Sequence, residues 1–196
     1  WMAENYGTIA KWVGRGIEYG DVVAEMEMDE AELAKYHQVK DAFMPLLGRL
    51  DRANRELLLP AFADGQGALV LDSQMTSKRW CDYMPPSAKP LPLFELAVVC
   101  GVSDAELLKQ GVVEYINVIN AALAELRRLA PDEVPPVDVP LPSERFTDAG
   151  AMYFYPLPEN AKVDERILPN AGLTEDLAVV ALSPDHTQRL LKETTP

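Results

Sequence analysis

Residues 95–108 read ELAVVCGVSDAELL, and residues 176–191 read DLAVVALSPDHTQRLL. Each phrase holds an acidic residue, the run Leu-Ala-Val-Val, a Ser with an Asp close behind it, and then a Leu-Leu pair. A short apolar run is typical of a buried strand, and Ser is a favoured residue at the start of a helix. Each phrase therefore predicts a strand that leads into a capped helix. A fainter third version, ALVLDSQMTSKRW, lies at 68–80.

The two phrases also predict how their strands are buried. Leu-Ala-Val-Val has no polar alternation, which is typical of strands that are buried on both faces or lie centrally in a sheet. Helices on one side and a further layer on the other would supply this cover. The spacing from 68–72 to 95–100, and from 151–156 to 177–182, favours two antiparallel pairs.

The predicted fold class is α+β, with a mainly antiparallel sheet packed against helices. The repeated phrase leaves two interpretations open: a pseudo-symmetric duplication of one strand–helix unit, or chance similarity between two ordinary units. A tight turn, DGQG at 64–67, precedes the first strand, and LPNAGL at 168–173 is predicted as another turn.

Two segments precede the strong helical signals. A short helix is expected around 8–14, and DVVAEMEM at 21–28 alternates with period two, which predicts a half-buried strand. Asp29 and Glu32 then have the spacing of a capping box at the start of a helix over 29–59. Pro45 predicts a kink or a break near 41–45 of this helix, and Pro60 its end.

A second long helix is predicted over 103–129, because Ser103 and Glu106 form another capping-box pattern. Six apolar residues mark its expected buried face: Leu107, Val112, Ile116, Ile119, Leu123 and Leu126.

The domain organisation follows from these elements. Residues 1–60 are predicted as a mostly helical segment that packs on an α+β sheet domain over 61–196, as one compact unit. Five prolines in 131–142 exclude regular structure there and predict a stiff connector. PPSAKPLP at 85–92 is expected to be extended and exposed, either as a link or as a ligand for polyproline recognition.

Composition limits the partners. The 196 residues include 31 acidic and 18 basic side chains, for a net charge of −13. This charge argues against nucleic acid and against an anionic membrane surface, since both are bound through Lys and Arg. No run approaches the roughly 20 apolar residues of a membrane span, and the N-terminus lacks the apolar core of a signal peptide. Because the chain begins with Trp1 rather than Met, we expect a processed product or part of a larger protein.

The combination of PAFADGQGALVLD, LPLFELAVVCGVSD, YFYPLP and DLAVVALSPDHTQRLL resembles uncharacterised bacterial envelope or secreted proteins built of repeated strand–helix modules. The resemblance covers about residues 60–196 and rests on apolar phrases, so it carries over no catalytic position. It implies export, with a periplasmic or secreted location favoured over the cytoplasm, and a larger parent chain.

The sequence contains no recognisable catalytic or metal-binding motif, and we predict no catalytic, cofactor or metal residue. His37 and His186 are far apart in the sequence. His186 is expected to be solvated or locally hydrogen-bonded, and His37 to have a surface or boundary position on its helix. Cys81 and Cys100 are predicted as two buried thiols rather than a disulfide, although the sequence does not decide whether they pair. A pairing of Cys100 with either histidine for nucleophilic catalysis is disfavoured, because Cys100 ends an apolar strand.

Two groups of acidic residues are candidate cation ligands. Asp64, Asp72 and Glu95 could gather calcium where turn and strand ends converge, but turn chemistry explains them better. The dense run EMEMDEAE at 25–32 is interpreted as a solvated segment with a helix cap.

The expected function is a non-catalytic module for protein–protein interaction or assembly, with a protein partner or self-association. Four aromatic residues form the candidate contact patch: Trp80, Tyr83, Tyr153 and Tyr155. One alternative is a small-molecule pocket between the sheet and the long helix, lined by Tyr115, Tyr153 and Tyr155. A carboxylate-dependent hydrolase is the third hypothesis.

Overall fold

The computed structural model describes residues 2–63, 65–155, 157–158 and 161–193. The chain divides into two compact units. The helical unit comprises Trp1–Ala63 and Glu106–Leu141, and the sheet unit comprises Asp64–Ala105 and Pro142–Pro196. The long helix thus groups with the N-terminal helices, whereas the sequence-based division into 1–60 and 61–196 placed it with the sheet.

The helical unit begins with a hairpin of α1 (Met2–Glu27) and α2 (Glu30–Ala53). The predicted capping box is confirmed: the Asp29 carboxylate accepts hydrogen bonds from the amides of Ala31 and Glu32, and the Glu32 carboxylate accepts one from the Asp29 amide. The strand predicted at 21–28 is wrong, because this segment completes α1. Its Ala, Glu and Met residues favour a helix, and this preference prevails over the alternating pattern.

Of the kink or break predicted near 41–45, the break is wrong, since α2 continues through Pro45 to Ala53. One turn of π-helix, η1 (Asn54–Leu58), follows directly, and α3 (Leu59–Ala61) then extends the helix past Pro60. A proline inside a helix removes one backbone donor but does not force the helix to end when the flanking turns are packed.

The long helix α4 (Ala105–Leu129) extends about 37 Å. Its buried residues are Leu108, Gly111, Ile116 and Val118. Of the predicted face, Ile116 is buried, whereas Val112, Ile119 and Leu126 are exposed, so the predicted face is partly wrong. Gly111 has a packing role, because a Cβ at this position would overlap the Leu58 side chain.

The Pro-rich connector has no strand or helix, as predicted, and runs back along α4. The Asn120 side chain holds it in place by donating to the Val139 carbonyl at 2.9 Å and accepting from the Val139 amide at 2.7 Å. Arg127 donates to the Val137 carbonyl about two helical turns further along α4.

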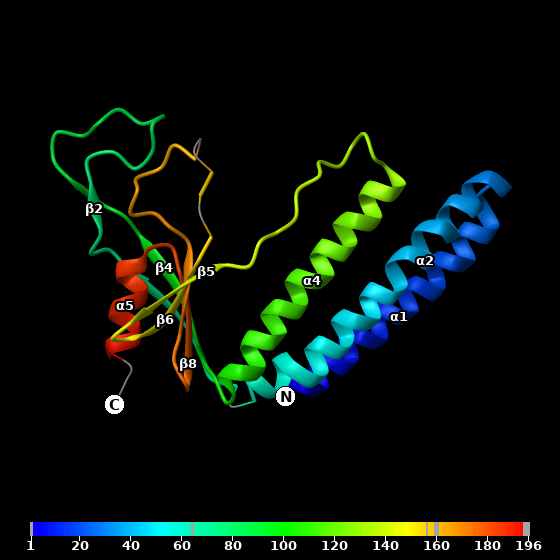
Figure 1. Ribbon diagram of the computed structural model, residues 1–196, viewed down its shortest axis with the longest axis horizontal. Coiled ribbons are helices and arrows are strands. Elements are labelled where there is room, and N and C mark those ends of the chain that lie inside the picture. Colours follow the sequence, from blue (N-terminus) through cyan, green and yellow to red (C-terminus); the bar gives the residue numbers. More distant parts are fainter. Residues whose placement is uncertain (1, 64, 156, 159–160, 194–196) are drawn as a thin grey trace. The chain divides into compact units, whose positions relative to one another are not determined.

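The sheet unit contains a six-stranded antiparallel sheet in the order β1-β4-β8-β7-β6-β5 (Figure 1). The strands are β1 (Gly67–Asp72), β4 (Glu95–Gly101), β5 (Ser143–Thr147), β6 (Gly150–Phe154), β7 (Asn170–Leu173) and β8 (Leu177–Ala181). A second small sheet pairs β2 (Thr76–Ser77) with β3 (Leu91–Pro92). The predicted α+β class is confirmed.

The two repeated phrases pair with each other. Residue Val98 of β4 lies opposite Val180 of β8, and Val99 lies opposite Val179. The predicted pairing of 68–72 with 95–100 is confirmed by β1 and β4. The second predicted pair is wrong, because β7 lies between β6 and β8 and occupies the segment predicted as a turn at 168–173.

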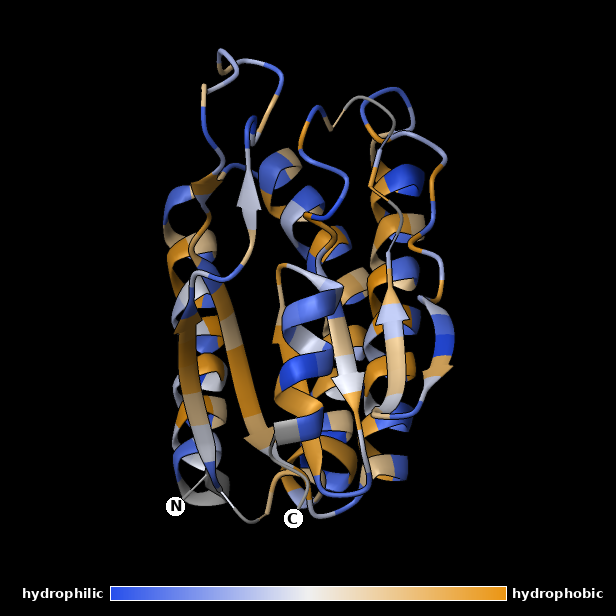
Figure 2. Ribbon diagram, turned by 90° about the vertical axis from the view of Figure 1, so that its left-hand side faces the viewer, coloured by the Kyte–Doolittle hydropathy of each residue, from blue (hydrophilic) through white to orange (hydrophobic). Residues whose placement is uncertain are grey.

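One face of the sheet is covered by α5 (Pro184–Glu193), which lies across the sheet in Figure 2. Val99 and Val179 are buried on this side, at 8% and 0% exposure, together with Leu190 and Leu191 of α5. Of the two alternatives predicted for these strands, the central position is confirmed, since β4 and β8 both have neighbours on each side. Burial on both faces is wrong, since Val98 and Val180 are 44% and 57% exposed. Neighbouring strand residues point to opposite faces, so one layer of helix covers only every second residue.

Ile116→Ala tests the packing of α4. Ile116 is 6% exposed, so its truncation should lower the free energy of unfolding by about 2–5 kcal/mol. Ile119→Ala is the matched control on the same helix, at 43% exposure, and should change it by less than about 1 kcal/mol. Urea denaturation followed by circular dichroism gives both values. Equal effects would mean that α4 is rotated relative to the described packing.

Gly172→Ala tests the contact between β7 and α5. An added Cβ would lie 2.5 Å from Cγ2 of Thr187 and 2.7 Å from Cδ1 of Leu191, so we expect a loss of about 1–3 kcal/mol of stability. Gly67→Ala in β1 is the control, because its Cβ would lie 3.6 Å from the nearest atom, the Val99 carbonyl oxygen. The same denaturation experiment checks both, and a tolerated Gly172→Ala would contradict this packing.

Candidate functional site

The sheet unit contains a buried carboxylate, Glu95, which is 0% exposed at the start of β4. Its Oε1 accepts a hydrogen bond from the Ser183 hydroxyl at 2.6 Å. Its Oε2 accepts from the Met75 amide at 2.9 Å and from Nη2 of Arg189 at 3.0 Å. Both oxygens of this carboxylate are therefore engaged.

Arg189 also pairs with Asp72, at 2.9 Å, so it joins the ends of β1 and β4 to α5. Burial alone would raise the pKa of Glu95, but the bonds from Ser183, Met75 and Arg189 together lower it below its ordinary value. The Ser73 amide and the Arg189 guanidinium likewise lower the pKa of Asp72. A carboxylate with a lowered pKa is a weak proton acceptor, which argues for a structural role.

The structure therefore brings two of the predicted calcium ligands together, since Asp72 lies opposite Glu95 in the β1–β4 register. Both are bound by Arg189 rather than arranged around a cation. Asp64 lies outside the described residues. Within the described part of the chain, no three His, Cys, Asp or Glu side chains are grouped to hold a metal ion.

His186 lies next to this cluster in the first turn of α5. The prediction of a solvated or locally hydrogen-bonded side chain is wrong: the residue is 1% exposed, and neither ring nitrogen has a hydrogen-bond partner among the described residues. Its backbone amide donates to the Ser183 hydroxyl oxygen at 3.2 Å, so Ser183 caps the helix. His37, by contrast, is exposed on α2 as expected.

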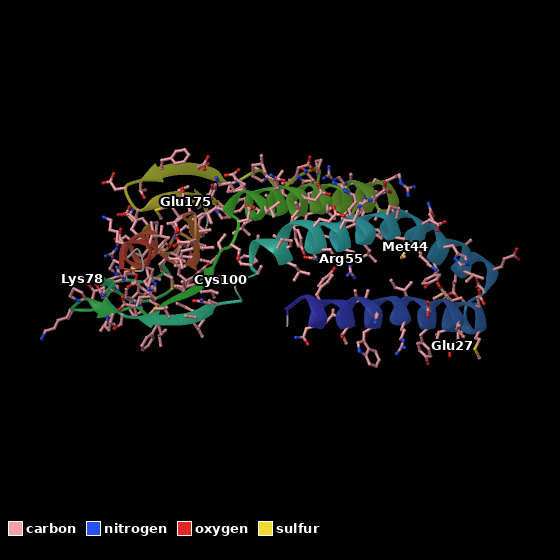
Figure 3. All side chains as sticks on the ribbon, turned by 90° about the horizontal axis from the view of Figure 1, so that it is seen from below. Glu27, Met44, Arg55, Lys78, Cys100 and Glu175 are labelled. Carbon is pink, nitrogen blue, oxygen red and sulfur yellow. The ribbon has the colours of Figure 1, made fainter. Side chains whose placement is uncertain are left out.

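A second polar network lies in the helical unit and joins three helices. The hydroxyl of Tyr115 on α4 donates to Asn54, and the Asn54 amide donates to the Tyr6 hydroxyl on α1. Tyr6 donates in turn to Asp51, which also accepts from Arg55. The Arg55 guanidinium lies 5.2 Å from the centre of the Tyr6 ring; Arg55 is labelled in Figure 3. The bond from Arg55, with that from Tyr6, lowers the pKa of Asp51. The network positions α1 and α4 on α2.

Shallow grooves flank α2 in the same unit. One, of about 320 Å³, lies between α1 and α2 and is lined by Val13, Ile17, Phe43 and Leu47. Another, of about 520 Å³, lies between α2 and α4 near Pro45 and Arg128. Their openings are wide, and the polar groups at their rims form ion pairs, as Lys40 does with Asp21.

The predicted aromatic patch is distributed over two parts of the sheet unit. Trp80 and Tyr83 lie between β2 and β3, where the Trp80 carbonyl accepts from the Asp164 amide and Lys162 lies over the Tyr83 ring. Tyr153 lies in β6 and donates to Glu144, and Tyr155 follows that strand. The ligand pocket that was predicted to combine Tyr115 with Tyr153 and Tyr155 draws on residues of both units.

The side of the sheet opposite α5 exposes apolar side chains, and it was not predicted as a functional surface. We call this surface the open sheet face. On β1, β4 and β8 it consists of Gly67, Leu69, Leu71, Leu96, Val98, Cys100, Ala178 and Val180, as the strand register and the alternation of side chains require. We include Leu182, which directly follows β8.

None of these nine residues is charged. The leucines and valines among them are 39–72% exposed. Further along the sheet, Val180 lies opposite Ala171, Ala171 opposite Tyr153, and Tyr153 opposite Glu144, the first charged residue in this row. The uninterrupted Leu-Ala-Val-Val runs are the sequence feature that indicates this surface, because such runs place apolar residues on both faces of a strand.

Both cysteines are free. Cys100 lies on the open sheet face and is labelled on β4 in Figure 3, and it is half-buried rather than part of the core. Cys81 is also half-buried, in a short bridge to Val163.

No protein-family model matches the chain, and no curated protein or solved structure shows significant similarity to it. Of the helices that the structure describes, none combines the length and the apolar character that crossing a membrane would require.

Glu95→Gln tests the buried cluster. At neutral pH the loss of charge should lower the free energy of unfolding by about 1.5–3 kcal/mol, the range for hydrogen bonds to charged groups. The folded-state pKa of Glu95 lies below the ordinary 4.5, so its contribution is complete above that pH and is lost as the pH falls through the lowered value.

As the pH drops below about 5, wild-type stability should therefore fall more steeply than that of Glu95→Gln. Glu175→Gln, at an exposed position of the same unit, should follow the wild-type curve. Urea denaturation at a series of pH values measures this, and parallel curves for all three proteins would refute a charged Glu95 in the folded state.

Proposed function

We propose that this chain is a non-catalytic module for protein–protein interaction or assembly, and that its contact surface is the open sheet face. The observation that carries the proposal is the uncharged, exposed apolar surface over three adjacent strands. Its six leucines and valines expose on the order of 500 Å², near the upper end of the largest patch on a typical monomer, and such patches are often functional.

The surface is large enough to drive association. At roughly 25 cal/mol per Å², covering about 500 Å² gains about 12 kcal/mol before the costs of association are subtracted. Leu69 and Leu71 extend the surface to the edge strand β1, so a partner can reach it from the side of the sheet as well as from above.

The proposal of a non-catalytic module is supported by the polar groups around Glu95, which are engaged with one another. Glu95 and Asp72 are bound by Arg189, and Ser183 donates to Glu95 while it caps α5. A nucleophile or a general base needs a free position toward a substrate. Turnover by the purified protein that Glu95→Gln abolishes would favour the carboxylate-dependent hydrolase instead.

The proposal is tested with the fluorescent apolar probe anilinonaphthalene sulfonate on dilute protein. Val180→Lys places a charge at the centre of the open sheet face and should reduce probe fluorescence by at least about half. Val137→Lys is the matched control, because Val137 is 63% exposed in the connector and Val180 is 57% exposed. Circular dichroism verifies that both variants are folded. Equal fluorescence from the two variants would overturn the proposed contact surface.

A further inference from the structure

We infer that the partner of the open sheet face is a second copy of this chain, so that two sheets pack face to face. The inference rests on the proposed function, because it names the occupant of the same surface. Three properties of the surface support it: its charge, its geometry and its area.

The absence of charge on the open sheet face favours a partner surface that is also uncharged over one that is positively charged. The chain carries a net charge of −13, but β1, β4 and β8 present no charged side chain on this side. Recognition of a basic partner would need acidic groups in contact with it, and Glu144, at the far edge, already accepts from Tyr153. Two copies bring no like charges together across these three strands.

The sheet unit has the geometry of one of the two sheets of a β-sandwich. An antiparallel sheet is covered by α5 on one side and presents leucine and valine side chains on the other. Two such faces pack about 10 Å apart, with their side chains interdigitating. A twofold axis then makes the contact isologous, so that one patch supplies both sides of the interface.

The exposed area is sufficient for such a dimer. The six leucines and valines of two copies together cover about 1,000 Å², which is the lower limit for a specific interface. Tyr153, which lies opposite Ala171 further along the same face, adds to this area when the copies overlap beyond β8. We therefore expect a reversible dimer.

Sedimentation velocity over about 1–300 μM protein tests the inference. The wild-type chain and Val137→Lys should show the same monomer–dimer equilibrium, and Val180→Lys should raise the dissociation constant at least about tenfold. Added salt should strengthen the dimer, because it screens the repulsion between two chains of charge −13. A wild-type chain that stays monomeric throughout, or an equal effect of the two lysine variants, would overturn it.

Cys100 gives a second measurement that does not depend on a lysine variant. In Cys81→Ser the only remaining thiol is Cys100, on the open sheet face. Its rate of reaction with a thiol reagent should fall several-fold as dimer forms, and a rate independent of protein concentration would contradict the inference.

The two tests separate the inference from the proposed function. If Val180→Lys reduces probe binding but the wild-type chain is monomeric, the face is a contact surface and its occupant is a different protein. If Val180→Lys does not change probe binding, both the proposed contact surface and the inferred dimer are refuted.

Discussion

The sheet unit depends on the pairing of β4 with β8 under α5. The two strands place Val99 and Val179 on one side, where Leu190 and Leu191 cover them. Gly172 in β7 lets α5 approach closely, since a Cβ there would overlap its side chains. The remaining strands extend from this pair on both sides, with β1 next to β4 and β7, β6 and β5 beyond β8.

Glu95 of the first repeated phrase and Ser183 of the second also connect β4 with α5. Glu95 accepts from Ser183, and the Ser183 oxygen accepts from the His186 amide, so a continuous chain of bonds leads from β4 to the first turn of α5. Arg189 adds an ion pair one turn further along. Breaking a buried pair of this kind leaves an uncompensated charge, and this cost disfavours other positions of the helix.

Much of the local structure could be predicted because its causes are local. The Asp29 capping box, the strands at 68–72 and 95–100, and the capped helix at the end of the second phrase each rest on a few neighbouring residues. The sequence-based predictions were wrong where tertiary contacts determine the local structure. The short strand β7 forms because β6 and β8 pair with it on both sides, and NAGL itself gives no strand signal.

The candidate site was less predictable for the same reason. Glu95 and Ser183 are 88 positions apart, and only the β4–β8 register brings them together. His186 was predicted to have a solvated or locally hydrogen-bonded side chain, yet the packing of α5 buries its ring. The open sheet face follows from a fact that the sequence does not contain, namely that a helix covers one side of the Leu-Ala-Val-Val strands and not the other.

The distribution of charge on the chain indicates why one side of the sheet is left without a helix. A chain of net charge −13 has enough polar surface to stay dispersed, and a lysine or glutamate on β4 or β8 would cost little on an exposed strand. Nevertheless, Leu96, Val98 and Val180 are apolar and lie side by side. An edge or a face that is meant to stay in water is normally protected by charge, so the lack of charge at the middle of this sheet is the property of a surface that another apolar surface covers.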